Sequence, residues 1–394
     1  MQLLRYERPP KSGAVRSENH PTPARHFQWL DGVRGLSVLW IAFFHCILSY
    51  NNERFPSPLT MDSLSSFLGQ CAPGGHVFAK ILCGLEAVVA AVLLRGSQAV
   101  GVFLLFSGFG LTYSLVKSGG AGISWASWYR RRLARLFPVY WLAHLIFLVS
   151  PFAVLHDKID YRFLLSFFGD RVYPVDQMFY YLVPAWWFMG MLIEFYIVFP
   201  LLYKLMRRLG WVWYLVFCIV LTSGARYALQ VIKADGNYVM GAFFVCRLWE
   251  FAAGMALGEL MAKAPDETSR RIFSSWGFFL GVVTFVLGML TYQPNFLFSF
   301  SDGLMATGLA LILIHAARLL DSIPGIGKAF AIAGVYSYSI YLFHQPYVIF
   351  AGERLQARSF PVFLISASAI ICLISLMSIG IESAVNRTLK RFFS

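Results

Sequence analysis

Long apolar segments, separated by short polar and basic connections, repeat along the chain from about residue 30 onward. Ten of these segments reach or approach the length of about 20 residues that a helix needs to cross a bilayer core. They lie near residues 36–50, 99–116, 136–155, 184–203, 211–232, 239–261, 272–292, 303–317, 329–350 and 361–385. The pattern predicts an all-α integral membrane protein with about ten transmembrane helices.

The composition supports a membrane protein rather than a soluble one. Of the 394 residues, 58% are hydrophobic and only 13% are charged, whereas soluble domains average about 25% charged residues. The first 28 residues are polar and basic, without the apolar stretch of a cleavable signal peptide. We therefore expect a flexible cytoplasmic tail at 1–28, a membrane domain at 29–386 and a short basic cytoplasmic tail at 387–394.

The distribution of basic residues indicates an orientation. The net charge is +13. In a membrane protein an excess of Lys and Arg is explained by their role in setting the orientation of the helices, so we expect no nucleic-acid partner. With ten spans and both termini in the cytoplasm, the inner segments hold 22 Lys and Arg and the outer segments hold 9, as the positive-inside rule requires. A further apolar segment at 76–94 would reverse this balance if it spanned, so we interpret it as an outer or re-entrant helix.

Six cysteines are scattered along the chain without a CxxC pair, and most lie in apolar segments. This spacing indicates neither a disulfide framework nor a zinc site, and we expect no metal.

The stretch WLDGVRGLSVLWIAFFH, residues 29–45, combines a cation with a deeper histidine. Ten residues separate Arg34 from His45, which places the imidazole roughly 16 Å beyond the guanidinium along a helix. Arg34 would then lie at a headgroup surface and His45 near the middle of the bilayer. An ionisable side chain at that depth is costly and indicates a function.

Four other strings belong with this stretch: GVFLLFSGFGLTYSL at 101–115, SWYRRRLARLFPVYWLAH at 127–144, PAWWFMGMLIEFYIVFPLLY at 184–203 and GVYSYSIYLFHQPYV at 334–348. In this order, and together with LDGVRG and its histidine, they resemble the acyltransferase 3 family of multi-pass membrane O-acyltransferases. The resemblance extends over nearly all of the chain from residue 29.

This resemblance implies a ten-helix core that takes an acyl group, usually acetyl from acetyl-CoA on the cytoplasmic side, and delivers it to an acceptor hydroxyl. Family acceptors are most often sugars of lipopolysaccharide, peptidoglycan or exopolysaccharide, or glycosylated metabolites. The family's arginine and histidine, ten residues apart, match Arg34 and His45. Its RxxR motif matches Arg132 and Arg135, and its SGF motif begins at Ser107.

His45 suits a general base or a transient acyl carrier, because an imidazole titrates near neutral pH. The alternative is a polar packing residue bonded to a neighbouring helix. Arg132 and Arg135 share one helical face at a spacing of three and could bind the phosphates of CoA. Basic residues beside a span also fix orientation and contact anionic lipid, so both interpretations stay open.

Three further residues are candidates for the site. Glu194 could share the depth of His45 and orient its imidazole, although it aligns with a glutamine of many relatives and is equally well explained as structural. His344, near the outer end of its span, could contact the acceptor or cap its helix ahead of Pro346. Ser107 could polarise the thioester carbonyl or bond back to its own helix.

Other polar and aromatic residues have simpler explanations. Arg247 and Glu250, three residues apart, are predicted to form a buried ion pair. Trp186 and Trp187 could stack on a sugar or belong to an interfacial aromatic belt. Phe103 stands where relatives often carry an aspartate, so no carboxylate role is assigned there.

The leading hypothesis is a bacterial inner-membrane enzyme that uses acyl-CoA, with acetyl-CoA as the expected donor and a carbohydrate or glycolipid as acceptor. Membrane lipid surrounds it, and homo-oligomerisation is left open. The alternative is an exporter of polysaccharide or lipid-linked sugar whose polar residues line a path, although no internal repeat is evident. A purely structural membrane subunit would leave the shared motifs unexplained.

Overall fold

The computed structural model describes residues 28–119, 123–150, 159–171, 178–179, 181–234, 236–292 and 296–393. The expected N-terminal tail lies outside these residues, apart from Gln28. The described part of the chain is helical and contains no strand. The longer helices are α1 (Gln28–Asn51), α2 (Met61–Cys71), α3 (Val77–Leu94), α4 (Ala99–Lys117), α5 (Trp125–Val149), α8 (Trp187–Val231), α10 (Leu248–Lys263), α12 (Ser275–Leu290), α13 (Phe298–Asp321), α14 (Ile326–Val335), α15 (Ser337–Leu355) and α16 (Phe360–Phe393).

Shorter elements connect these helices. They are η2 (Arg95–Gln98), α6 (Tyr161–Phe167), η3 (Pro184–Trp186), α9 (Asn237–Ala242), η4 (Phe244–Arg247) and α11 (Pro265–Ile272).

Six helical runs among the described residues are long and apolar enough to cross a membrane, or eight if each of two bent helix pairs forms one span. The chain is therefore a multi-pass membrane protein, as the sequence predicts, while the count of about ten spans and the cytoplasmic location of both termini stay predictions.

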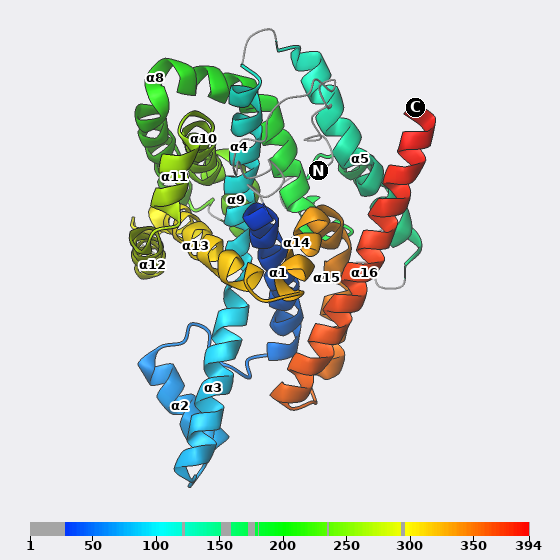
Figure 1. Cartoon of the computed structure of the whole chain (residues 1–394). Coiled ribbons are helices and arrows are strands. Elements are labelled where there is room, and N and C mark those ends of the chain that lie inside the picture. The colour runs from blue at the N-terminus through cyan, green and yellow to red at the C-terminus, as the bar shows by residue number, and fades with distance from the viewer. Residues whose placement is uncertain are drawn as a thin grey trace, which may run out of the picture.

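Helix α8 shows why the number of membrane spans is difficult to count. Its 45 residues include Gly210 with φ 76° and ψ 157°, a conformation that ends a helix and that glycine adopts readily. The chain turns there and begins a second helical segment (Figure 1).

Helix α1 occupies the centre of the bundle, where it packs against α13, α14, α15 and α4 (Figure 1). Two glycines allow α1 and α14 to approach backbone to backbone. A Cβ atom on Gly35 would lie 1.9 Å from the carbonyl oxygen of Phe330, and one on Gly334 would lie 1.7 Å from that of Asp31. Small residues permit this kind of close helix packing in membranes. The glycines of two motifs therefore place the Arg34 helix directly against the segment that leads to His344.

Helices α4 and α10 make a second close contact of the same kind. A Cβ atom on Gly108 would lie 2.2 Å from the carbonyl oxygen of Phe251, and one on Gly254 would lie 1.7 Å from that of Leu105. Gly108 is the middle residue of the SGF string. Part of that motif therefore serves helix packing, which leaves its neighbour Ser107 to face the space between α4 and the helices on its other side.

Helices α2 and α3 form a hairpin that projects from the body of the molecule (Figure 1). Through η2, α3 continues into α4 as a run of 41 residues, about 60 Å long at the rise of an α-helix, which is roughly twice the thickness of a bilayer core. Helix α4 packs within the body, whereas α3 is largely exposed. The run that contains both helices is a candidate membrane span by length and composition, so the location of 76–94 outside the membrane stays a prediction.

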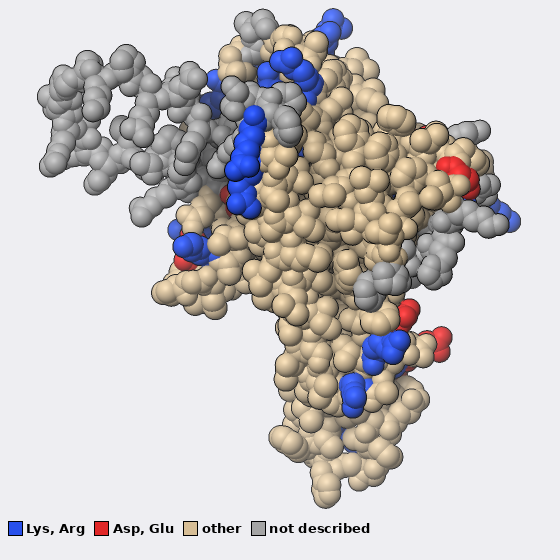
Figure 2. All heavy atoms as spheres, turned by 90° about the vertical axis from the view of Figure 1, so that its right-hand side faces the viewer, with Lys and Arg blue, Asp and Glu red and all other residues tan. Residues whose placement is uncertain are grey.

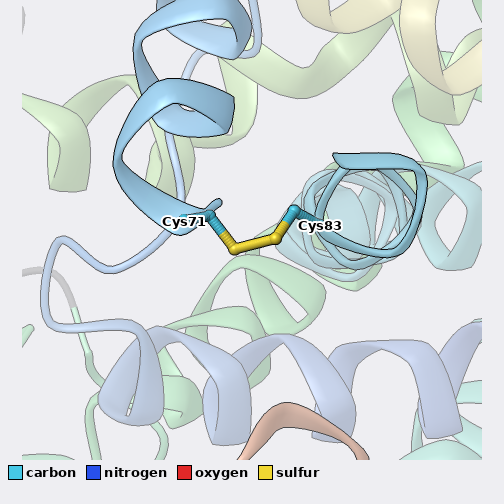
Figure 3. The surroundings of a disulfide bond; sticks show 2 residues. All are labelled: Cys71 and Cys83. Carbon is cyan, nitrogen blue, oxygen red and sulfur yellow. A yellow bond between two sulfur atoms is a disulfide. The ribbon is translucent and has the colours of Figure 1, made fainter. Parts of the chain in front are cut away.

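A disulfide bond joins Cys71 of α2 to Cys83 of α3 (Figure 3). The expectation from the sequence that no cysteines pair is therefore wrong. The spacing of twelve residues matches no common motif, and only the antiparallel packing of the two helices brings the thiols together. Disulfides persist in oxidising compartments, which is consistent with a location of this hairpin outside the cytoplasm.

One face of the body is broadly uncharged. On the face shown in Figure 2, tan side chains cover the middle of the molecule, basic side chains gather toward the top, and a second charged group lies on the lower projection. Many large apolar side chains are exposed on the described helices, and a wide uncharged surface between two charged zones is the expected exterior of a protein surrounded by lipid.

Candidate functional site

A cavity of about 770 Å³ lies between α1, α4, α5, α8, α14 and α15. Four arginines line it: Arg34 from α1, and Arg131, Arg132 and Arg135 from α5. Among the described residues that line it, Glu382 of α16 supplies the only carboxylate. The cavity therefore carries an excess of positive charge and is suited to an anionic ligand.

The three lining arginines of α5 lie close together because they follow one another within the first turns of a single helix. Ser124 caps the start of α5, because its side chain accepts a hydrogen bond from the backbone N–H of Ser127, and the basic run follows within the next two or three turns. The guanidinium of Arg132 lies 5.6 Å from the centre of the Trp128 ring, one turn earlier, a distance at which a cation is attracted to an aromatic face. On α1, Arg34 forms a 3.6 Å ion pair with Asp31.

The other end of the cavity is apolar. Ile41, Val100, Phe103 and Phe188 line it, together with Tyr341. The ring centres of Phe103 and Phe188 are 6.3 Å apart, and those of Phe188 and Tyr341 are 5.4 Å apart. Phe103 thus helps to close this end with aromatic rings.

His45 lies just beyond the apolar end. It is four residues after Ile41 on α1, which places both on one helical face, yet His45 itself does not line the cavity. Its ring is half-buried and lies 5.2 Å, centre to centre, from the ring of His344 on α15. The two histidines, 299 positions apart in the sequence, form a pair at the interface of α1 and α15.

Gln345 is a third polar residue at this point, and the sequence analysis gave it no role. Its Oε1 accepts a 2.7 Å hydrogen bond from the backbone N–H of Ala185, and its Nε2 lies 3.4 Å from Nδ1 of His45. Gln345 appears in the motif string beside His344. No local pattern indicates its partners, because they lie 160 and 300 positions away.

The motif at 184–186 holds this part of α15 in place. Pro346 lies inside α15 and lacks an N–H, so the carbonyl of Leu342, four residues earlier, loses its helical partner. The indole Nε1–H of Trp186 donates a 2.9 Å hydrogen bond to that carbonyl instead. The Tyr341 hydroxyl also donates to the carbonyl of Ala185. Trp186 is fully buried, so it neither stacks on a sugar nor belongs to an interfacial belt.

His344 is fully buried, and the alternative that it caps a helix ahead of Pro346 is wrong, because α15 continues to Leu355. Its Nδ1 lies 2.7 Å from the carbonyl oxygen of Tyr341. Its Nε2 has no hydrogen-bond partner. A buried nitrogen without a partner is uncommon and marks a position where a ligand or water can bind.

Glu194 and Ser107 have different surroundings. The Glu194 carboxylate accepts a 3.2 Å hydrogen bond from the backbone N–H of Phe244, and no hydrogen bond joins it to His45. The polar side chains of His344 and Gln345 lie against His45 instead. Ser107 lines the cavity together with Arg34, Arg132 and Arg135. The structure therefore brings four of the seven predicted site residues around one cavity and leaves His45 and His344 beside its end, with Glu194 apart.

Two other buried polar networks lie apart from the cavity. The predicted pair of Arg247 and Glu250 is confirmed at 3.1 Å, and Asp302 joins Arg247 to Arg226 at 2.9 and 2.8 Å. In the second network His144 hydrogen-bonds through both ring nitrogens, to the carbonyl of Tyr140 and to Ser166. Neither network lines the cavity. Within the described residues, no group of three or more His, Cys, Asp or Glu is arranged to hold a metal ion.

Comparisons with known proteins identify the family of this chain. The sequence profile of the acyltransferase domain matches residues 27–381. Acyltransferase MdmB of Streptomyces mycarofaciens is 25% identical over 294 residues, which cover 66% of this chain and 70% of that protein. No solved structure matches. The profile covers the arginine-lined cavity, both histidines and the helices between them, and on this basis the chain belongs to the acyltransferase 3 family.

Proposed function

We propose that this protein is an O-acyltransferase of the bacterial cytoplasmic membrane. It moves an acyl group, with acetyl as the simplest case, from acyl-CoA to a hydroxyl of a carbohydrate or glycosylated acceptor. The observation that supports this proposal most directly is the cavity, in which four arginines line one end and the apolar end stops one helical turn from His45.

The two ends of the cavity suit the two ends of an acyl-CoA. The nucleotide of CoA carries phosphates, and guanidinium groups bind phosphates through paired, charge-assisted hydrogen bonds. Arg34, Arg132 and Arg135 would bind them at the basic end. The thioester, at the tip of an uncharged arm, would then reach the apolar end near Ile41.

The histidine pair supplies the chemistry that acyl transfer needs. A hydroxyl group is a weak nucleophile and attacks a thioester carbonyl readily only when a base takes its proton, which contributes about 10²- to 10⁴-fold to the rate. The ring centre of His344 lies 5.6 Å from that of Tyr341, which lines the apolar end of the cavity, and 5.2 Å from that of His45. Transfer would occur there, at the interface of α1 and α15.

The first test is release of free CoA from acetyl-CoA by the purified protein in lipid, with extracted bacterial cell-envelope glycans as acceptor. We expect turnover by the wild type and its loss in His45→Ala. His76→Ala, which alters an exposed histidine on the projecting hairpin, is the matched control and should behave like the wild type. Protein that elutes as a single folded species validates each variant.

The exporter alternative predicts a different result. An exporter has no reason to consume a thioester, so the absence of CoA release with acetyl, propionyl and longer acyl donors would contradict the proposal. Turnover that persists in His45→Ala would retain the enzyme but remove His45 from its chemistry.

A further inference from the structure

The hydrogen-bond partners around the histidine pair determine which ring nitrogens carry protons. Backbone groups supply the fixed points of this network, since an N–H can only donate and a carbonyl can only accept. The N–H of Ala185 faces one end of the Gln345 amide at 2.7 Å, so that end is the oxygen. The amide NH₂ of Gln345 therefore faces His45.

This orientation determines the tautomer of His45. The Gln345 NH₂ group can only donate, and it lies 3.4 Å from Nδ1 of His45. Nδ1 is therefore the acceptor, and in the neutral ring the proton lies on Nε2. In this state Nε2 of His45 is a donor and has no lone pair with which to take a proton or an acyl group.

The tautomer of His344 is the opposite one. The carbonyl of Tyr341 can only accept, so Nδ1 of His344 donates to it at 2.7 Å. The lone pair of the neutral ring then lies on Nε2, which is fully buried and has no partner. His344 thus presents a free base, and its ring centre is 5.2 Å from that of His45.

We propose that His344, rather than His45, is the general base of the reaction, and that His45 is the hydrogen-bond donor that holds the acceptor oxygen. This inference rests on the proposed acyltransferase function and assigns the roles within it. A hydroxyl oxygen bound between the two rings, whose centres are 5.2 Å apart, would accept a hydrogen bond from Nε2–H of His45 while its own O–H donates to Nε2 of His344.

The transfer step balances without any further reactant. The hydroxyl O–H bond breaks and its proton moves to Nε2 of His344. The oxygen forms a bond to the acyl carbon, the carbon–sulfur bond breaks, and the CoA thiolate leaves with the electron pair. The proton on His344 then passes to that thiolate, which restores the starting tautomer. In this scheme His45 is never acylated.

Two substitutions separate the roles, because asparagine and glutamine each reproduce one nitrogen of histidine. His344→Asn keeps an amide N–H near the position of Nδ1, so the bond to the Tyr341 carbonyl is retained while the base is lost. His45→Gln keeps an N–H near the position of Nε2, so the donor is retained while no proton can be accepted. The assay measures O-acetyl transfer from acetyl-CoA to extracted cell-envelope glycans, with His45→Ala as the variant that removes the donor.

We expect His344→Asn to lose about 100-fold or more in rate, the usual contribution of a general base, and His45→Gln to remain at least about tenfold more active than His344→Asn. Hydroxylamine, a nucleophile that does not require a base, should restore CoA release in His344→Asn. His344→Gln provides a second base-free variant if the asparagine variant does not fold.

The proposal is overturned if His45→Gln is as inactive as His344→Asn, or if His344→Asn retains activity. Absence of thioester turnover by the wild type itself would instead remove the acyltransferase proposal, and this one with it.

Discussion

Two groups of arginines lie within the helical bundle or beside its cavity, and they differ in what surrounds them. Arg226 and Arg247 lie almost fully buried between α8, η4 and α13, where Asp302 and Glu250 provide one carboxylate for each guanidinium. Around the four arginines of the cavity, Glu382 is the one carboxylate among the described lining residues, while Asp31 pairs with Arg34 at 3.6 Å.

This difference separates a structural role from a binding role for the same residue type. Buried charges are tolerated when they are paired and hydrogen-bonded, and a neutral network has no charge left for a ligand. An excess of partly exposed guanidinium groups around a cavity leaves their hydrogen-bond donors available. The comparison therefore predicts that substitutions in the first group affect folding, whereas substitutions in the second affect ligand binding.

The largest effect is expected from Asp302→Ala, which leaves Arg226 and Arg247 with only Glu250 between them. Breaking a buried ion pair by removing one partner typically costs about 3–5 kcal/mol. We expect a lower unfolding temperature in detergent and a reduced yield of folded protein. Asp266→Ala, on the exposed surface of α11, is the control. Equal stability of the two variants would show that the network contributes little.

A smaller effect is expected at the cavity. Hydrogen bonds to charged groups contribute about 1.5–3 kcal/mol each, so Arg132→Leu and Arg135→Leu should each raise the KM for acetyl-CoA by about tenfold or more without lowering the unfolding temperature. Arg130→Leu removes a neighbouring arginine that is exposed and does not line the cavity. If Arg130→Leu raises KM as much as the other two, the effect belongs to the general positive charge of this surface and not to a binding site.

The smallest effect is expected from Glu194→Gln. The carboxylate accepts a hydrogen bond from the N–H of Phe244, and the amide oxygen of glutamine can accept the same bond. We expect kcat to change by less than about threefold, whereas removal of a true general acid or base costs about 10²-fold or more. A fall of that size in kcat, with unchanged stability, would return Glu194 to the catalytic group.

The helices and the contacts within a helix could be predicted from the sequence, because they depend on residues that are close together along the chain. Apolar segments predict the helices, and a spacing of three predicts that Arg132 and Arg135 share a face and that Arg247 meets Glu250. These relations span less than one turn of helix, so the geometry of a single helix determines them. The membrane class follows from composition alone.

The partners of His45 could not be predicted in the same way. Periodicity indicates which face of a helix is buried but not which helix covers it. Gln345 and His344 reach His45 only because glycines bring α1 against α14 and because the 184–186 motif anchors α15. Asp302 likewise meets Arg226 from 76 positions away. The prediction that Glu194 orients His45 was based on the similar depth of the two residues along their helices. Depth does not determine whether two helices are neighbours, so it could not show that the two side chains meet.

The bond between Cys71 and Cys83 makes the orientation of the chain visible on a gel. The hairpin follows the first span directly, so the two thiols meet an oxidant only if that segment has been exported during insertion. Chains inserted the opposite way would keep both thiols reduced, and after denaturation a maleimide reagent of several kilodaltons would add two more labels to them, so that they migrate more slowly than correctly inserted ones. The ratio of the two bands would count correctly inserted molecules in any expression host, with no assay of activity.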